Sequence, residues 1–336
     1  MRVDRIRFTA RDQVETDQID LDPAPGPGQV LIKTRMTMVS QGTEMAALRG
    51  THTRSNLAEP PVWLRYPSVP GYLQVGVIEA VGAGVTGFAV GERVIGEGPG
   101  CWNTHQSHLV QAADPRWLVK VPAGVDDRAA VMAKLASVAT HGLRTVDPLI
   151  GESCAVIGLG MVGQLASRLA VLTGMRVTAC DPVPARRVIA SGVPQLTVVA
   201  PEDLAVGDPA GFEHVIEASG APAGFLAACT VARRLGRISV VSSPHRPVEI
   251  RLYEHVHSKC LQVHGAHGSS MAVDPTAADR WTERRQKELF LALVAAGRID
   301  VSPLITHVHA WHEAPQVYRR LIDDPSAFLG VVFTWN

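Results

Sequence analysis

The chain has 336 residues, of which 46% are hydrophobic and 19% charged, as in ordinary globular proteins long enough for two domains. Lys plus Arg and Asp plus Glu both number 32, so charge gives no reason to expect a nucleic-acid or membrane partner and favours a small molecule. The N-terminus lacks a signal-like segment, and no apolar run approaches the roughly 18 residues that span a bilayer, which predicts a cytoplasmic protein. The cysteines, interpreted as reduced, are Cys101, Cys154, Cys180, Cys229 and Cys260.

The order of predicted elements indicates an α/β fold with an inserted nucleotide domain. Short apolar runs between Pro and Gly clusters predict a β-rich, barrel-like region, with strands at 5–9, 29–34, 75–81 and 93–95. Helices begin near residue 124 and then alternate with strands, which we place at 155–157, 176–180, 214–217, 237–241 and 261–264. This alternation is typical of a doubly wound parallel sheet. Helices at 282–296 and 312–322 and a strand at 329–334 complete the chain.

The segment 156–163 reads Val-Ile-Gly-Leu-Gly-Met-Val-Gly, between a predicted strand and a predicted helix. In a dinucleotide-binding loop Gly158 permits the tight turn, Gly160 lets the backbone approach the pyrophosphate, and Gly163 lets the helix pack on its strand. The pyrophosphate then lies at a helix N-terminus, where free N–H groups favour an anion. The remaining residues of the predicted loop are Leu159, Met161 and Val162. The sequence therefore predicts a redox enzyme.

Several further strings resemble the medium-chain dehydrogenase/reductase family. They are the segments 23–32, 81–94, 217–220 and 236–241. The resemblance implies a Rossmann domain at 135–266, inserted in a GroES-like catalytic domain formed by 1–134 and 267–336. It also implies cofactor contacts at Ser219 and Gly220, and a homodimer.

The sequence departs from the family's zinc-dependent members at each expected catalytic ligand. Gln41 stands where those members have Cys, Tyr72 replaces the His of Gly-His-Glu, and Lys134 lies where a third ligand is expected. Gln, Tyr and Lys are poor zinc ligands. The structural zinc needs four close cysteines, and only Cys101 lies in the relevant segment. We therefore expect no metal, and the strings at 40–44, 70–72 and 104–107 resemble a zinc-free branch that includes bacteriochlorophyllide dehydrogenases and related secondary-metabolite enzymes.

Without zinc, hydride transfer still needs a proton donor or acceptor and a group that stabilises negative charge on the substrate oxygen. The resemblance places Gln41, Tyr72 and Lys134 near the reacting atoms, with Thr43 at a position where relatives hold a proton-relaying hydroxyl and Glu44 adjacent. A lysine beside a tyrosine would lower the phenol pKa by its charge. Each residue also has another interpretation. Tyr72 could fill the space of the missing histidine, Lys134 could be a surface residue, and Glu44 could cap a helix or pair with a nearby arginine. Gln41 and Thr43, which do not titrate near neutral pH, could contact substrate or nicotinamide.

Three further residues are candidates for the same site. His105 is a rival proton donor because histidine titrates near neutral pH, although a loop histidine without a catalytic role is the alternative. Trp63 and Trp102 are candidate substrate contacts or packing anchors, and Gln41 is a candidate substrate contact.

The cofactor expected at the glycine loop is NAD(H). Asp181 ends the second nucleotide-domain strand, where it can accept hydrogen bonds from the ribose hydroxyls and repel a 2′-phosphate. Arg186 and Arg187 follow closely and could instead neutralise that phosphate, so NADP(H) stays open.

The predicted activity is zinc-independent hydride transfer between a nicotinamide and a secondary alcohol or ketone (EC 1.1.1.-), on a polar substrate such as a natural product. One alternative is a quinone or enone reductase that uses NADPH. The other is a catalytically silent dinucleotide sensor.

Overall fold

The computed structural model describes residues 1–98, 102–206, 210–277 and 279–335. Cys101 lies outside these residues, whereas Cys154, Cys180, Cys229 and Cys260 are free thiols. The chain divides into two compact units: unit 1 comprises Met1–Lys134 and Glu283–Asn336, and unit 2 comprises Leu135–Thr282. No helix in the described ranges is long and apolar enough to cross a membrane.

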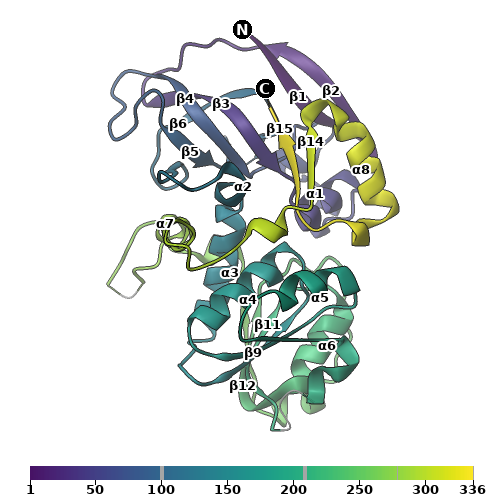
Figure 1. Cartoon of the computed structure of the whole chain (residues 1–336). Helices are drawn as coiled ribbons and strands as arrows, with labels where there is room; N and C mark the ends of the chain where they lie inside the picture. Colours follow the sequence, from purple (N-terminus) through teal and green to yellow (C-terminus); the bar gives the residue numbers. More distant parts are fainter. Residues whose placement is uncertain (99–101, 207–209, 278, 336) are drawn as a thin grey trace. The chain divides into compact units, whose positions relative to one another are not determined.

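Unit 1 is the β-rich, GroES-like part of the α/β fold (Figure 1). Its main sheet has the strand order β14-β15-β3-β4-β5-β7, with β6 added on β3, and β1 and β2 form a separate antiparallel pair. The strands are β1 (Arg2–Ala10), β2 (Gln13–Asp20), β3 (Gln29–Met38), β4 (Gln74–Val81), β5 (Arg93–Gly96), β6 (His108–Ala112), β7 (Val119–Lys120), β14 (His307–Ala310) and β15 (Val331–Thr334). The helices are α1 (Gln41–Leu48), α2 (Asp127–Ala130), the start of α3 (Ala133–Thr145), α7 (Glu283–Ala295) and α8 (Ala314–Asp323).

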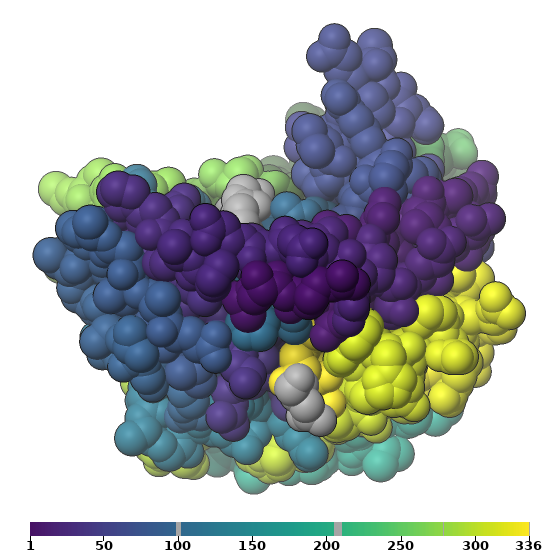
Figure 2. Space-filling view, turned by 90° about the horizontal axis from the view of Figure 1, so that it is seen from above, coloured from purple at the N-terminus to yellow at the C-terminus, as the bar shows by residue number. Residues whose placement is uncertain are grey.

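Two apolar clusters hold unit 1 together. One is formed by side chains of β3, β4 and β6 and includes Ile32 and Ile78. The other joins α1 and α8 to β15, with Tyr318 and Phe333 fully buried in it. The segment between α1 and β4, coloured indigo, stands out from the face formed by β1 and β2 in Figure 2. The second cluster thus anchors α1, which carries several candidate site residues.

Unit 2 is the doubly wound domain predicted from the alternating pattern. Its parallel sheet has the order β10-β9-β8-β11-β12-β13, so the strands are added outward in one direction from β8 and in the other direction from β11. The strands are β8 (Ser153–Ile157), β9 (Arg176–Cys180), β10 (Leu196–Val199), β11 (Phe212–Glu217), β12 (Ala232–Val240) and β13 (Gln262–Gly265). The helices are α4 (Met161–Leu172), α5 (Pro184–Ser191) and α6 (Pro222–Val231). Ligands of such sheets bind outside the carboxyl ends of the strands, at the point where these two directions meet.

The return to unit 1 comes after Thr282, later than the boundary after Ala266 that the sequence suggested. The intervening residues pack on the nucleotide unit. His141 bonds Ser270 through Nε2 and Oγ at 2.8 Å, and the guanidinium of Arg144 lies 3.9 Å from the centroid of the Trp281 ring. These contacts keep the segment with unit 2.

Candidate functional site

The glycine loop of unit 2 follows β8 and leads directly into α4. Gly158 has φ +93°, and a Cβ there would lie 2.7 Å from the Cα of Ser219. A Cβ on Gly163 would lie only 1.8 Å from the carbonyl oxygen of Gly158, so the helix touches its strand there. Gly160 differs, because its N-cap position has open space where a Cβ would point. The loop therefore leaves room for a ligand at the N-terminus of α4, where the first N–H groups have no helical partner.

Asp181 is buried at the carboxyl end of β9 and fixes the glycine loop. Its carboxylate accepts hydrogen bonds from the backbone N–H of Leu159 (2.7 Å) and of Val183 (2.8 Å). Arg187 donates to the Asp181 carbonyl oxygen at 2.6 Å, and Nη1 of Arg186 lies 3.8 Å from the carboxylate. A carboxylate can accept more than two hydrogen bonds, so these two backbone contacts do not use all the lone pairs of Asp181.

Glu217 organises the second half of this nucleotide site, a role that the sequence did not suggest. Its buried carboxylate accepts hydrogen bonds from the backbone N–H of Ser219 (2.8 Å) and of Gly220 (3.2 Å). It also accepts from the hydroxyls of Ser219 and Ser242, which follow β11 and β12. One carboxylate thus sets the turn that carries Ser219 and Gly220 beside Gly158.

In unit 1, Glu44 and His105 form a fully buried network with their neighbours. The carboxylate of Glu44 accepts from the Ser40 backbone N–H (2.8 Å) and the Tyr318 hydroxyl (2.7 Å), and it lies 3.0 Å from His105 Nε2. His105 Nδ1 lies 2.7 Å from the Thr37 hydroxyl. Both side chains are 0% exposed, so neither can reach a substrate in this conformation. They tie α1 to the sheet.

Gln41 also serves to place α1. Its side-chain amide donates to the backbone carbonyl of Leu329 at 2.8 Å, which joins α1 to the segment before β15. The arginine considered as a partner of Glu44 is Arg49, which instead lies 3.9 Å from the carboxylate of Asp12.

Tyr72 is a partly buried phenol surrounded by hydroxyl groups. Its oxygen lies 2.6 Å from the Ser40 hydroxyl. Burial raises the pKa of the phenol above its ordinary value, which outweighs the lowering by hydrogen bonds with Ser40 and Thr43 and by the charge of Lys134. The charge of Lys134 lowers the phenol pKa, as predicted, but burial decides the direction of the net shift. Tyr72 is therefore protonated at neutral pH.

An aromatic row extends from Tyr72. The Trp102 ring stacks on Tyr72 with centroids 5.9 Å apart, and Trp63, in a short helical turn (Val62–Leu64), packs on Trp102 at 4.7 Å. Trp102 is 5% exposed, and its indole N–H finds no hydrogen-bond partner among the residues that the structure describes. Buried indole N–H groups are normally bonded, so this donor is an unsatisfied polar group beside Tyr72.

Lys134 occupies the first turn of α3 and is held by carboxylates rather than by solvent. Its ammonium lies 2.9 Å from Glu97 Oε2 and also pairs with Glu283. Burial alone would lower the lysine pKa, but these two carboxylates raise it above its ordinary value. The side chain is a permanent cation, so it is neither a metal ligand nor a proton donor near neutral pH. Glu97, Glu283 and the neighbouring Lys287 gave no sequence signal, because they lie far from Lys134 in the chain.

The residues at the expected zinc positions do not fit zinc. A zinc site needs three or four thiolate, imidazole or carboxylate ligands. Gln41 and Lys134 are held in other interactions, and Tyr72 is a neutral phenol. Within the described ranges, no group of three or more His, Cys, Asp or Glu side chains could hold a metal ion.

Comparisons with known proteins find a family model and relatives that match this chain. Residues 26–146 match the family model of the alcohol dehydrogenase GroES-like domain. An L-threonine 3-dehydrogenase of Pectobacterium carotovorum is 30% identical over 272 residues, which cover 72% of this chain and 75% of that protein.

Solved structures share the fold over nearly the whole chain. An Escherichia coli oxidoreductase of unknown specificity, involved in membrane biogenesis, has a TM-score of 0.84 at 16% identity, covering 99% of both chains. A putative zinc-binding dehydrogenase of Sinorhizobium meliloti, bound to NADP, has a TM-score of 0.79 at 19% identity, also covering 99% of both. The glycine loop, the GroES-like match and the L-threonine 3-dehydrogenase relative together show that the chain belongs to the medium-chain dehydrogenase/reductase superfamily of NAD(P)-dependent oxidoreductases.

Proposed function

We propose that the protein is a zinc-independent alcohol dehydrogenase or ketone reductase that prefers NAD(H). The observation that carries the proposal is the set of side chains at the zinc-ligand positions of relatives. A neutral phenol and a permanent ammonium stand there, Tyr72 and Lys134, and neither is suited to bind zinc. A positive charge near the substrate oxygen is the function that the metal would otherwise supply, and a proton donor completes the reduction of a ketone.

The glycine loop, with Ser219 and Gly220, would hold the nicotinamide cofactor, which would supply or accept the hydride in the interconversion of a ketone and a secondary alcohol. The Tyr72 hydroxyl donates the proton to the substrate oxygen during reduction and accepts it during oxidation. The hydroxyl of Ser40, 2.6 Å from the Tyr72 oxygen, and that of the partly exposed Thr43 relay the proton between Tyr72 and water. Because burial keeps Tyr72 protonated, the site favours ketone reduction at neutral pH, and alcohol oxidation should speed up as pH rises.

The remaining site residues are assigned by what they contact. Glu44 and His105 position α1 and its hydroxyl groups, and Gln41 supports them from the side of β15. Trp63 and Trp102 offer a wall for a flat, apolar part of an otherwise polar substrate, such as a secondary metabolite, and the Trp102 N–H can bond one of its oxygens.

The preference for NAD(H) rests on Asp181, whose carboxylate repels a 2′-phosphate. Ser219 and Gly220 complete the cofactor site, and Arg186 and Arg187 lie close enough to Asp181 to admit some NADP(H). A homodimer through the edge strand β13 accords with the exposed backbone edge and the exposed Val263 there. We place the enzyme in the cytoplasm.

The proposal is tested with Tyr72→Phe, and Tyr66→Phe serves as the matched control. Tyr66 is also partly buried, but its hydroxyl bonds the carbonyl oxygens of Ala47 and Leu48. We expect Tyr72→Phe to lower kcat by about 10²–10⁴-fold against the best substrate of an alcohol and ketone panel, with the Kd of NADH changed less than about twofold. Tyr66→Phe should keep its kcat, and the purified enzyme should hold far less than one zinc per chain.

Four results would contradict the proposal in different ways. Full activity of Tyr72→Phe removes the phenol from the proton step. Stoichiometric zinc whose removal abolishes turnover contradicts the metal-free mechanism. Turnover of quinones with NADPH alone indicates a quinone reductase, whereas NADH binding without any hydride transfer indicates a sensor.

A further inference from the structure

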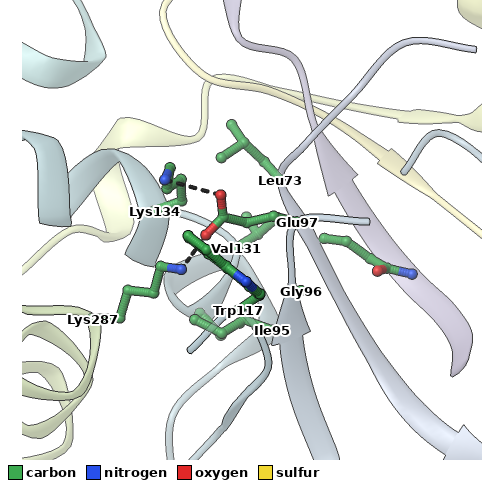
Figure 3. A pocket seen from close by; sticks show the side chains of 10 residues that line it. Leu73, Ile95, Gly96, Glu97, Trp117, Val131, Lys134 and Lys287 are labelled. Atoms are coloured by element: carbon green, nitrogen blue, oxygen red, sulfur yellow. Dashed lines mark hydrogen bonds and ion pairs between the residues drawn. The ribbon is translucent and has the colours of Figure 1, made fainter. Parts of the chain in front are cut away.

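Four charged side chains from three separate segments form an ion-pair cluster inside unit 1. Glu97 follows β5, Lys134 lies in the first turn of α3, and Glu283 and Lys287 are one turn apart in α7. Each ammonium contacts both carboxylates. The Lys134–Glu97 and Lys287–Glu283 pairs measure 2.9 Å, and Lys134 also pairs with Glu283 and Lys287 with Glu97. Figure 3 shows both lysines converging on the Glu97 carboxylate.

The cluster is buried on every side except at Lys134. The side chains of Lys287, Glu97 and Glu283 are 1%, 3% and 8% exposed, whereas that of Lys134 is 17% exposed. The adjoining cavity, about 10 Å³, has room for about one water and is lined partly by Trp117 and Leu73. Lys134 is therefore the most exposed member of the cluster, and the other three side chains are almost closed to solvent.

Stability alone does not explain four buried charges. Removing ions from water costs several kcal/mol each, and well-packed apolar residues in place of a buried ion pair are often equally stable or more so. What the arrangement does provide is a lysine whose charge and place are fixed, because two carboxylates hold one ammonium and Lys287 compensates the second negative charge.

The charge of Lys134 acts on Tyr72. Leu73, the chain neighbour of Tyr72, lines the same cavity as Glu97 and Lys134. Among the groups with the largest effects on the phenol pKa, the charged ones are Glu44, from α1, which raises it, and Lys134, from α3, which lowers it. The other near groups are the neutral hydroxyls of Ser40 and Thr43.

We infer that Glu97, Glu283 and Lys287 are positioning residues that hold the Lys134 ammonium near Tyr72 as a permanent charge, which favours negative charge on the phenol or substrate oxygen. This inference rests on the proposed function, in which Tyr72 exchanges the proton. It adds that the effect of the Lys134 charge on the Tyr72 pKa depends on Lys287, a residue that touches neither substrate nor cofactor.

The test uses two substitutions of opposite charge effect. Lys287→Met removes a positive charge from the cluster and should raise the apparent pKa in the pH profile of kcat/KM for alcohol oxidation. Glu97→Gln removes a negative charge and should lower that apparent pKa. Across roughly 10 Å at an effective dielectric constant of about 20, a unit charge shifts a pKa by about one unit, so about one unit is the upper bound for either shift.

Two further variants serve as controls. The double variant Glu97→Gln/Lys287→Met should return the apparent pKa close to that of the wild type, and Lys287→Arg should keep it. The absorbance of tyrosinate at alkaline pH, taken as the difference from Tyr72→Phe, gives the same ordering without a substrate. A merely structural role would lower Tm and activity in both single variants and would not produce pKa shifts of opposite sign.

The outcomes separate this inference from the proposed function. If Tyr72→Phe loses turnover but the two single variants shift the profile in the same direction or not at all, the cluster does not tune Tyr72 and the inference fails. If Tyr72→Phe keeps its turnover and pH profile, the proposed proton step fails. If Lys287→Met does not fold, the comparison of Glu97→Gln with the wild type still tests the inference. An apparent pKa that is unchanged or raised in Glu97→Gln overturns it.

Discussion

Two alanine substitutions in the glycine loop should separate packing from cofactor binding. In Gly163→Ala the new Cβ would lie 1.8 Å from the Gly158 carbonyl oxygen, which is backbone and cannot rotate away. Non-bonded carbon contacts normally begin near 3.5 Å, so α4 must move by more than about 1 Å from β8. In Gly160→Ala the Cβ meets nothing within 4 Å, and the residue has an ordinary negative φ of −65°.

The expected magnitudes follow from these contacts. Overpacking of this kind costs about 1–3 kcal/mol, and in a domain the size of unit 2 each kcal/mol lowers Tm by about 2–4 °C. Gly163→Ala should therefore melt several degrees below the wild type without any ligand. Gly160→Ala should keep the ligand-free Tm within about 1 °C but raise the Kd of NADH at least about tenfold, because its methyl group fills the space that the pyrophosphate needs.

Differential scanning fluorimetry with and without NADH, together with calorimetric titration, makes this measurement. At saturating NADH, a tenfold weaker Kd removes about 1.4 kcal/mol of ligand stabilisation, so Gly160→Ala should show a smaller NADH-dependent rise of Tm. A wild-type melting temperature for Gly163→Ala would refute the packing argument. Wild-type NADH affinity for Gly160→Ala would refute the placement of the pyrophosphate.

Two further outcomes are expected. Asp181→Ala should weaken NADH binding, because the carboxylate also holds the Leu159 N–H. It should also raise the ratio of kcat/KM with NADPH to kcat/KM with NADH about tenfold or more. An unchanged ratio would show that Asp181 does not select the cofactor. Burial raises the pKa of Glu283, but the ammonium groups of Lys134 and Lys287 outweigh this and lower it to about 2. A carboxylate whose pKa is lowered in the folded state contributes stability above about pH 4.5, and this stability is lost as pH falls toward 2. In urea unfolding, the free energy of unfolding of Glu283→Gln should therefore fall less steeply over that pH range than that of the wild type.

Much of unit 2 could be predicted from the sequence, because its information is local. The buried strands β8 and β9 are nearly continuous apolar runs, and the glycines between β8 and α4 are required by turn and packing geometry that few other residues allow. Unit 1 was less predictable. β2 has no buried residue and alternating polar side chains, and β6 and α1 are short, so their structure depends on the strands and helices they pack against.

The sequence by itself determined the nucleotide loop, the alternation of strands and helices, and the absence of usual zinc ligands at the expected positions. Only the tertiary structure decided the environments of the candidate side chains. It buried His105 against Glu44, and it paired Lys134 with Glu97 and Glu283, the latter 149 positions away. A motif constrains neighbouring backbone, whereas the charge and reach of an ionisable side chain depend on what distant segments place against it.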